Sequence, residues 1–518
     1  MKCEEKGKRR HHNRMPSASK PNFESTGLAL ATSLFTVSAV WFLGKIRRDS
    51  KHHGPPRHQH SSENYTDRTK GVVGNRGNRA LAPPIPYLEG FLKCLGDQCD
   101  LVTNPEGHVA LCIAENKLAL NLLQERFTQG GTAAAAFADE SVYCYNSFLG
   151  MPVAREAAAY FFARRFLFPE RQELPADEAL LHIRPSHVAL GAGCAALLNN
   201  LFYLLGEPGE CCLIPIPYYA AFENDMNLVA GIVPFGIHQV NPTLGPSVAE
   251  LNLAYMQAKA KGLTPKFLLL TNPNNPLGVI YRPEVLLANV QWARKRGLHT
   301  ISDEIYALST HQKPGQHGFQ SIIKVLDNDL GNDVHMLWAV SKDFGGSGLR
   351  VGFVYSQNEI FMEGLATLSI FTAVSGPIQY LVAELLTDDE FSDSFLDESR
   401  DRIHQSYLIC TNKLQEMVVP FIPAEAGLFV YVDLSSLLPE KTFACEERLS
   451  KLMLDHARIV LTPGESQRDT NPGMFRICYT WVSPEVLELA MERMSKLVGK
   501  LRRMDWDDLD SRQLKGIL

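Results

Sequence analysis

The sequence predicts a doubly wound, mostly parallel α/β domain followed by a smaller α+β domain. Five apolar, strand-like segments are each followed at once by polar or glycine-rich residues, and they end near residues 191, 217, 271, 303 and 341. Because parallel strands share one carboxyl edge, where α/β sheets bind their ligands, these polar residues are expected to meet. After about residue 375 the pattern changes to helices and short strands, which predicts the second domain.

Length and composition limit the class of protein. A chain of 518 residues is too long for one ordinary core, so two domains with extensions are expected. The apolar fraction of 45% and the charged fraction of 21% are typical of a soluble globular protein, and the net charge of -6 gives no reason to expect a nucleic-acid partner. Eleven scattered cysteines show neither a disulfide framework nor metal-ligand spacing, so a reducing, cytoplasmic location and no metal are predicted.

The first 83 residues differ from the rest. Most of them are basic, polar or rich in His, Pro and Gly, which predicts a disordered extension. Within it, residues 27–44 form an uncharged, largely apolar run followed by Lys45 and two arginines. Such a run is at the short end of a membrane-spanning helix, which needs about 20 apolar residues. A membrane anchor, a targeting or signal element and an apolar patch in a disordered tail all remain open.

The first strand end of interest lies in residues 187–198, whose pattern predicts a strand, a glycine turn and a helix. Gly193, Cys194 and Ala195 then stand at the amino terminus of that helix. Free backbone N–H groups and the positive end of the helix dipole make such a terminus a site for phosphate. A plain strand-to-helix turn has the same pattern.

The next two strands end in amides and acids. Four consecutive apolar residues, 267–270, predict a strand buried on both faces, and the Asn-Pro-Asn-Asn-Pro run of 272–276 then has to turn. A further strand ends at Asp303 and is followed by Tyr306. The carboxylate of Asp303 suits either a ligand or the cap of the next helix.

Lys342 follows the apolar run 335–340 and precedes a glycine-rich turn that leads to Arg350. A lysine at the carboxyl end of a strand can lower its pKa and form a Schiff base. Arg350 carries a planar, permanently charged fork suited to phosphate. The alternative is a solvated lysine after a strand. Arg476 lies inside another apolar strand, where an unpaired charge is expensive, so it either binds an anionic ligand or forms a buried salt bridge.

The run Ser-Lys-Asp-Phe-Gly-x-x-Gly-Leu-Arg, residues 341–350, resembles the lysine signature of class I aminotransferases of fold type I, which use pyridoxal 5'-phosphate. Within that group the sequence is most similar to 1-aminocyclopropane-1-carboxylate synthases and their non-plant relatives. The likeness runs from about Pro84 to about Arg502 in matching motif order. The resemblance implies a fold type I PLP-dependent transferase.

The resemblance also implies roles for individual residues. Lys342 would hold the cofactor, Asp303 would keep its ring nitrogen protonated, and Tyr306 would bind its phenolic oxygen together with Asn275. Tyr219, from the run Pro-Ile-Pro-Tyr-Tyr, would stack on the ring. The predicted phosphate ligands are Gly193, Cys194, Ala195, Ser341 and Arg350, with Ser341 standing in for the family's serine at the position of Ala339.

On the substrate side, the resemblance makes Arg476 the clamp on the α-carboxylate, beside Asn275, and puts Glu115 near the amino-acid end of the substrate. Phe148 stands where the family has a tyrosine that reaches the cofactor phosphate of a neighbouring subunit. A phenylalanine cannot donate that hydrogen bond, and Tyr145 is a candidate replacement.

The resulting prediction is a homodimeric, pyridoxal-phosphate-dependent aminotransferase that acts on an α-amino acid through an aldimine and a carbanion. A 1-aminocyclopropane-1-carboxylate synthase or another β/γ-eliminating lyase is the first alternative, and a catalytically idle, membrane-tethered binding protein is the second. The predicted boundaries are an extension at 1–83, an N-terminal arm with part of the small domain at 84–140, the large domain at 141–372, the small domain at 373–502 and a tail at 503–518.

Overall fold

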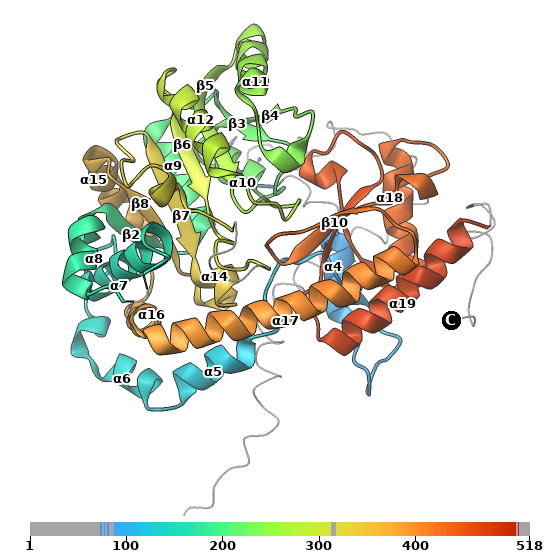
Figure 1. Cartoon of the computed structure of the whole chain (residues 1–518), viewed down its shortest axis with the longest axis horizontal. Helices are drawn as coiled ribbons and strands as arrows, with labels where there is room; N and C mark the ends of the chain where they lie inside the picture. The colour runs from blue at the N-terminus through green and yellow to red at the C-terminus, as the bar shows by residue number, and fades with distance from the viewer. Residues whose placement is uncertain are drawn as a thin grey trace, which may run out of the picture. The chain divides into compact units, whose positions relative to one another are not determined.

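The computed structural model describes residues 87–503 except 172 and 312–317, together with positions 73, 74, 77, 80, 81 and 506. All of these residues belong to one compact unit (Figure 1). The apolar run 27–44 lies outside the described residues, so its alternative interpretations stay predictions. Within the described part of the chain, no helix has the length and apolar character needed to cross a membrane.

Seven strands form the large sheet in the order β2-β8-β7-β6-β5-β3-β4. They are β2 (Val188–Gly191), β3 (Glu210–Pro215), β4 (Val233–Ile237), β5 (Thr264–Thr271), β6 (His299–Asp303), β7 (Val334–Ala339) and β8 (Gly352–Ser356). Of these seven, β8 alone runs opposite to the other six, because it is antiparallel to both of its neighbours, β2 and β7. The other six strands therefore point the same way, and their carboxyl ends share one edge, as the sequence predicted.

Helices cover both faces of this sheet because successive strand residues alternate between two cores. On β5, Leu268 and Leu270 pack in one cluster, whereas Phe267 and Leu269 pack in the other. The first cluster is covered by α7 (Pro152–Phe162), α11 (Val248–Ala260), α12 (Pro283–Arg294) and α16 (Gly376–Thr387). The second is covered by α9 (Cys194–Leu205), α10 (Phe222–Asn227) and α15 (Glu359–Leu368). The doubly wound α/β architecture is confirmed.

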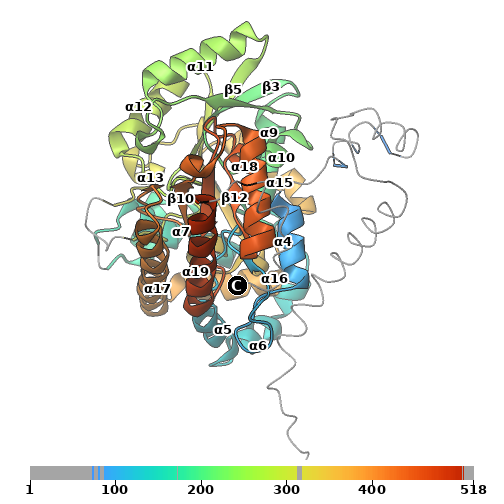
Figure 2. The ribbon, with the colours of Figure 1, turned by 90° about the vertical axis from the view of Figure 1, so that its right-hand side faces the viewer.

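The smaller sheet has four antiparallel strands in the order β12-β13-β10-β9. Their bounds are β9 (Phe421–Ile422), β10 (Phe429–Asp433), β12 (Thr462–Pro463) and β13 (Met474–Cys478). A short parallel pair, β1 (Val109–Ala110) with β11 (Ile459–Val460), lies in the same core cluster. Helices α4 (Tyr87–Gly96), α18 (Phe443–Leu452) and α19 (Pro484–Leu501) gather around these strands (Figure 2).

One long helix, α17 (Asp389–Glu416), links the two cores (Figure 1). Its first half buries Phe395 and Leu396 in the core of the large sheet, and its second half buries Ile403 and Leu414 in the core of the small one. The remaining helices are α5 (Leu120–Thr128), α6 (Thr132–Ala138), α8 (Ala176–His182), α13 (Ile322–Val325) and α14 (Val340–Asp343). Because α17 spans both cores, the domain boundaries at 140 and 372 stay a prediction.

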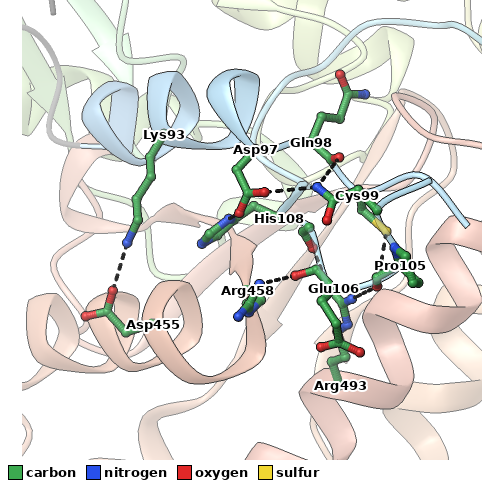
Figure 3. A network of polar contacts seen from close by, with 12 residues as sticks. Lys93, Asp97, Gln98, Cys99, Pro105, Glu106, His108, Asp455, Arg458 and Arg493 are labelled. Atoms are coloured by element: carbon green, nitrogen blue, oxygen red, sulfur yellow. Dashed lines mark hydrogen bonds and ion pairs between the residues drawn. The ribbon is translucent and has the colours of Figure 1, made fainter. Parts of the chain in front are cut away.

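Helix α4 and the loop after it are fastened to the C-terminal helices by polar contacts (Figure 3). The Lys93 ammonium lies 3.1 Å from the Asp455 carboxylate, and Arg493 Nη1 donates to the Gly107 carbonyl at 2.8 Å. Within the loop, His108 Nδ1 is 2.8 Å from Asp97 Oδ2. These contacts fix the start of the segment 109–116, part of which lines the cavity described below.

Gly107→Ala is expected to lower the free energy of unfolding by about 1–3 kcal/mol, the usual cost of overpacking. A Cβ at Gly107 would lie 2.6 Å from the backbone nitrogen of Cys99, which cannot move aside cheaply. Chemical denaturation measures the change. Gly96→Ala is the control, because its Cβ would meet no atom within 4 Å; equal stability of the two variants would contradict the prediction.

Candidate active site

A cavity of about 240 Å³ lies at the carboxyl edge of the large sheet. Its walls come from three parts of the chain that are distant in sequence: the ends of the large-sheet strands, β13 of the small sheet, and the N-terminal residues around 87 and 112–114. The lining includes Gly193, Cys194, Ala195, Tyr219, Asn275, Asp303, Tyr306, Ser341, Lys342, Arg350 and Arg476. The structure therefore brings together most of the residues that the sequence singled out.

Lys342 lies in α14, directly after β7. Its Nζ donates to the carbonyl oxygen of Ala114 at 2.6 Å, which turns the amine toward the small-domain wall of the cavity. Burial lowers the pKa of Lys342, and the nearby charge of Glu115 partly opposes that effect. A lowered pKa leaves more of the amine neutral, which is the form that attacks a carbonyl carbon.

Asp343 holds the turn that carries this lysine. Its carboxylate accepts hydrogen bonds from Trp338 Nε1 at 2.8 Å, Ser309 Oγ at 2.6 Å and the Leu308 backbone N–H at 3.1 Å. Burial raises the pKa of Asp343 to about 7. Because Trp338 is itself fully buried, the position of Lys342 is tied to the core of the large sheet.

The amino terminus of α9 and Arg350 form a cradle for an anion. Gly193 has a φ of 88°, and a Cβ there would lie 2.7 Å from Arg350 Nη2, so only glycine lets the guanidinium approach. Arg350 Nη2 donates to the Ala192 carbonyl at 3.1 Å. The backbone N–H groups, the helix dipole and the guanidinium converge, and this donor set fits a phosphate group.

Another part of the lining fits a protonated, electron-poor ring. Asp303 ends β6 and is 4% exposed, and its carboxylate accepts a hydrogen bond only from the Ile305 backbone N–H, at 3.3 Å, among the described residues. Burial raises the pKa of Asp303 to about 7. A buried carboxyl without a cationic hydrogen-bonding partner suits a ring N–H⁺. Asn275 Nδ2 donates to Tyr306 Oη at 3.2 Å, which places both groups for a phenolic oxygen.

Arg476 is 1% exposed in the middle of β13. Its Nη1 donates to Asn275 Oδ1 at 2.8 Å and its Nη2 to the Cys112 carbonyl at 2.8 Å, while Nε has no partner. Among the described residues no carboxylate pairs with this guanidinium. The structure therefore excludes the alternative that Arg476 forms a buried salt bridge with one of them. A buried cation held only by neutral acceptors suits an anionic ligand.

Two predicted residues do not line the cavity. Glu115 follows the lining residue Ala114, and its charge acts on Lys342 from outside the wall. The ring of Phe148 contacts that of Tyr145, with centroids 6.2 Å apart. Tyr145 is 96% exposed and does not line the cavity of its own chain, and its replacement of the missing tyrosine toward a neighbouring subunit stays a prediction.

Several residues that line the cavity were not predicted from the sequence: Tyr87, Cys112, Ile113, Phe222, Asp225, Thr271, Ile305 and Ser347. Ser347 could have been found, because it lies inside the glycine-rich turn between Lys342 and Arg350. Asp225 lies on α10, and burial, with repulsion from Asp303, raises its pKa to about 7. Nothing in the local pattern marks Tyr87 or Asp225, because folding alone brings them to the cavity.

A lysine, an acid and an anion cradle at the carboxyl edge of a doubly wound sheet define a fold type I, pyridoxal-phosphate-dependent enzyme. The family model described as "Aminotransferase class I and II" matches residues 112–494, so the chain belongs to that family. Membership implies pyridoxal 5'-phosphate as the cofactor, and the cradle, Asp303 and the Asn275–Tyr306 pair fit its phosphate, ring nitrogen and phenolic oxygen.

Two of the similar proteins are 1-aminocyclopropane-1-carboxylate synthases that are 30–31% identical to this chain. The 1-aminocyclopropane-1-carboxylate synthase 9 of Arabidopsis thaliana is 31% identical over 430 residues, which cover 80% of this chain and 87% of the relative. The 1-aminocyclopropane-1-carboxylate synthase of Glycine max is 30% identical over 442 residues, which cover 83% and 87%. Among solved structures, a Thermus thermophilus aspartate aminotransferase double mutant has a TM-score of 0.66 at 22% identity, covering 82% of this chain and 99% of the other, and it shows the fold alone.

Proposed function

We propose that the protein is an aminotransferase of the 1-aminocyclopropane-1-carboxylate synthase-like group, which removes the amino group of an α-amino acid. One observation carries the proposal: Lys342, Asp303, Arg350 and Arg476 converge in a single cavity at the strand edge. Loss of Lys342 or Asp303 would have favoured the idle binding protein, and both are present.

We assign the residues that would hold the cofactor from their chemistry. Gly193, Cys194 and Ala195 bind the phosphate together with Arg350, with Ser341 beside them, and Tyr219 packs against the ring. The Gly193 N–H already donates to the Gly191 carbonyl at 2.6 Å, so the donors in this turn are the N–H groups of Cys194 and Ala195. Bound pyridoxal phosphate supplies a ring that absorbs the electron pair left when a proton is removed from the α-carbon of the substrate. Asp303 keeps a proton on the ring nitrogen, which makes the ring a better acceptor of electrons.

The chain's own groups then orient the substrate and move the proton. Arg476 binds the α-carboxylate with its two terminal nitrogens, and Asn275 holds one of those nitrogens in place. Lys342 Nζ takes the α-proton and returns it at a different carbon, which is general acid–base catalysis. Burial lowers the pKa of Lys342, which leaves more of the amine in the neutral form that this task needs.

Ring closure of S-adenosylmethionine is the second candidate, because the relatives above carry the name of that synthase. That reaction also requires a carbon beside the sulfonium to be held for displacement. Phe148 lacks the hydroxyl of the tyrosine that the family has there, and loss of one positioning group can remove a special reaction while sparing removal of the α-proton. Amino-group transfer or β/γ-elimination is therefore favoured over ring closure.

The deciding assay incubates purified, cofactor-loaded protein with S-adenosylmethionine in one series and with a panel of amino acids in another. Mass spectrometry identifies the products. Keto acid together with accumulating pyridoxamine phosphate supports the proposal. Efficient formation of 1-aminocyclopropane-1-carboxylate and methylthioadenosine would establish the second candidate instead.

Borohydride reduction of the loaded protein is expected to leave the pyridoxyl group on Lys342, because this amine is buried at the cavity wall and has a lowered pKa. Peptide mapping by mass spectrometry locates the label. Lys117 is the internal control, because burial also lowers its pKa but its ammonium packs on the Trp481 ring, 3.6 Å from the centroid. A label on Lys117 or on any lysine other than Lys342 would refute the assignment.

We also propose that the protein is a homodimer whose contact surface includes exposed aromatic residues. Phe371 is 84% exposed, and the next residue, Thr372, accepts a hydrogen bond from Ala192 at the edge of the anion cradle, at 2.9 Å. Tyr143 and Tyr145 are also exposed apolar groups. Sedimentation equilibrium measures the mass in solution, and a monomer at micromolar concentration would oppose the proposal.

A further inference from the structure

The cavity holds few positive charges. Of the described residues that line it, three are cationic: Lys342, Arg350 and Arg476. Under the proposed function each of them has a partner, because Lys342 serves the cofactor aldehyde and the α-proton, Arg350 the phosphate, and Arg476 the α-carboxylate. No cation of this cavity is then left for a second carboxylate on the substrate.

The wall beside Arg476 is apolar. Cys112, whose carbonyl accepts from Arg476 Nη2, is followed by Ile113, and Tyr306, which is bonded to Asn275, is preceded by Ile305. Ile113, Ile305 and Tyr87 all line the cavity. All three also pack against the core of the small sheet. This core includes Phe475, on the same strand as Arg476, and Phe429, on the neighbouring strand β10. A substrate held by its carboxylate at Arg476 therefore places its side chain near these three groups.

The segment around Phe148 of a neighbouring subunit would not add a positive charge to the cavity. The family resemblance implies that this segment reaches the other subunit's site. Residues 132–151 contain no lysine and no arginine, whereas they include Asp139 and Glu140. Any contribution of this stretch to a neighbouring cavity is neutral or acidic. It adds no counter-ion for a side-chain carboxylate.

We propose that this site selects α-amino acids with an uncharged, apolar side chain and rejects those with a side-chain carboxylate, with Tyr87, Ile113 and Ile305 as the specificity-determining residues. This inference rests on the proposed function, in particular on Arg476 as the α-carboxylate clamp. A buried carboxylate without a counter-ion is costly, whereas apolar contact with the three side chains is favourable. Under this proposal the substrate of this chain is not aspartate, although the Thermus structure of similar fold is an aspartate aminotransferase.

The test uses α-methyl amino acids, which bind but have no α-proton to lose, so binding is measured without turnover. α-Methylleucine and α-methylaspartate have side chains of similar shape and different charge. Titration of the cofactor absorbance of the loaded protein gives the Kd of each. We expect α-methylleucine to bind about 100-fold more tightly. Equal binding, or tighter binding of α-methylaspartate, would overturn the inference, as would preferential binding of the cationic α-methyllysine.

Variants locate the selectivity. Tyr87→Ala is expected to weaken binding of α-methylleucine about tenfold, and Tyr87→Phe to preserve it, because the Tyr87 ring and not its hydroxyl makes the contact. Ile113→Ala should also weaken binding, and Ile360→Ala, the same change at an exposed position on α15, should not. Equal effects of Ile113→Ala and Ile360→Ala would contradict the placement of the substrate side chain.

A gain of function completes the test. Ile113→Arg or, if that variant does not fold, Tyr87→Arg should improve binding of α-methylaspartate relative to α-methylleucine at least about tenfold, because either supplies the missing cation. An unchanged ratio in a folded variant would overturn the inference. If no amino acid analogue changes the absorbance and no keto acid forms from any substrate, the proposed function itself fails, which distinguishes that outcome from a wrong side-chain preference.

Discussion

Asp303→Asn is expected to reduce kcat by about 10²–10³ while the cofactor still binds, because the loss of one preorganised charge at a reacting centre typically costs that much. The neutral amide cannot hold the proton on the ring nitrogen, whereas the phosphate cradle around Gly193 and Arg350 is untouched. Steady-state kinetics on cofactor-loaded protein measures the loss. Asp401→Asn, the same change on an exposed turn of α17, is the control. Near-normal turnover of Asp303→Asn would refute the role.

The same substitution should stabilise the cofactor-free protein. Burial raises the pKa of Asp303 to about 7, above its ordinary value of 3.8, so the folded state favours the neutral carboxyl. The resulting stability is present at low pH and is lost as the pH rises from about 4 through 7. Above pH 7 the Asn variant avoids this cost, which is a few kcal/mol at most, at about 1.4 kcal/mol per pKa unit. Thermal unfolding at pH 5 and pH 8 checks that the gain in Tm appears at the higher pH.

Arg476→Lys is expected to reduce kcat/KM by about 10²–10³, mainly through KM, because truncation of a buried, hydrogen-bonded charge costs about 2–5 kcal/mol. Lysine keeps the charge but cannot present two parallel N–H groups to a carboxylate. Initial rates against substrate concentration separate KM from kcat.

The matched control for Arg476→Lys is Arg493→Lys. Arg493 is also a buried arginine, but it donates to the backbone carbonyls of Pro105 and Gly107, away from the cavity (Figure 3). Its replacement should lower stability and leave KM unchanged. The clamp would be refuted if Arg476→Lys also left KM unchanged.

Much of the fold, and the part of the site that would hold the cofactor, can be predicted from short segments of the sequence. The apolar runs before Gly191, Thr271, Asp303 and Lys342 predict strands, and a parallel sheet brings their carboxyl ends to one edge whatever the rest of the chain does. Lys342 and Arg350 are likewise close in the sequence, separated by the end of α14, a glycine turn and one short 3-10 helix. For these residues the chemistry follows from the type of residue and its place after a strand.

The substrate end depends on tertiary structure. Arg476 meets Asn275 across 201 residues and Cys112 across 364, and Lys342 meets Ala114 across 228. These contacts form only when the core of the small sheet docks beside the large one, and hydrophobic periodicity specifies the faces of single elements but not which elements dock. Only the tertiary structure decided whether Arg476 has a counter-ion and whether Glu115 and Phe148 reach the cavity. It also decided that Tyr87 and Asp225 line the cavity. The reason is that each of these outcomes depends on distances between segments that are far apart in the sequence.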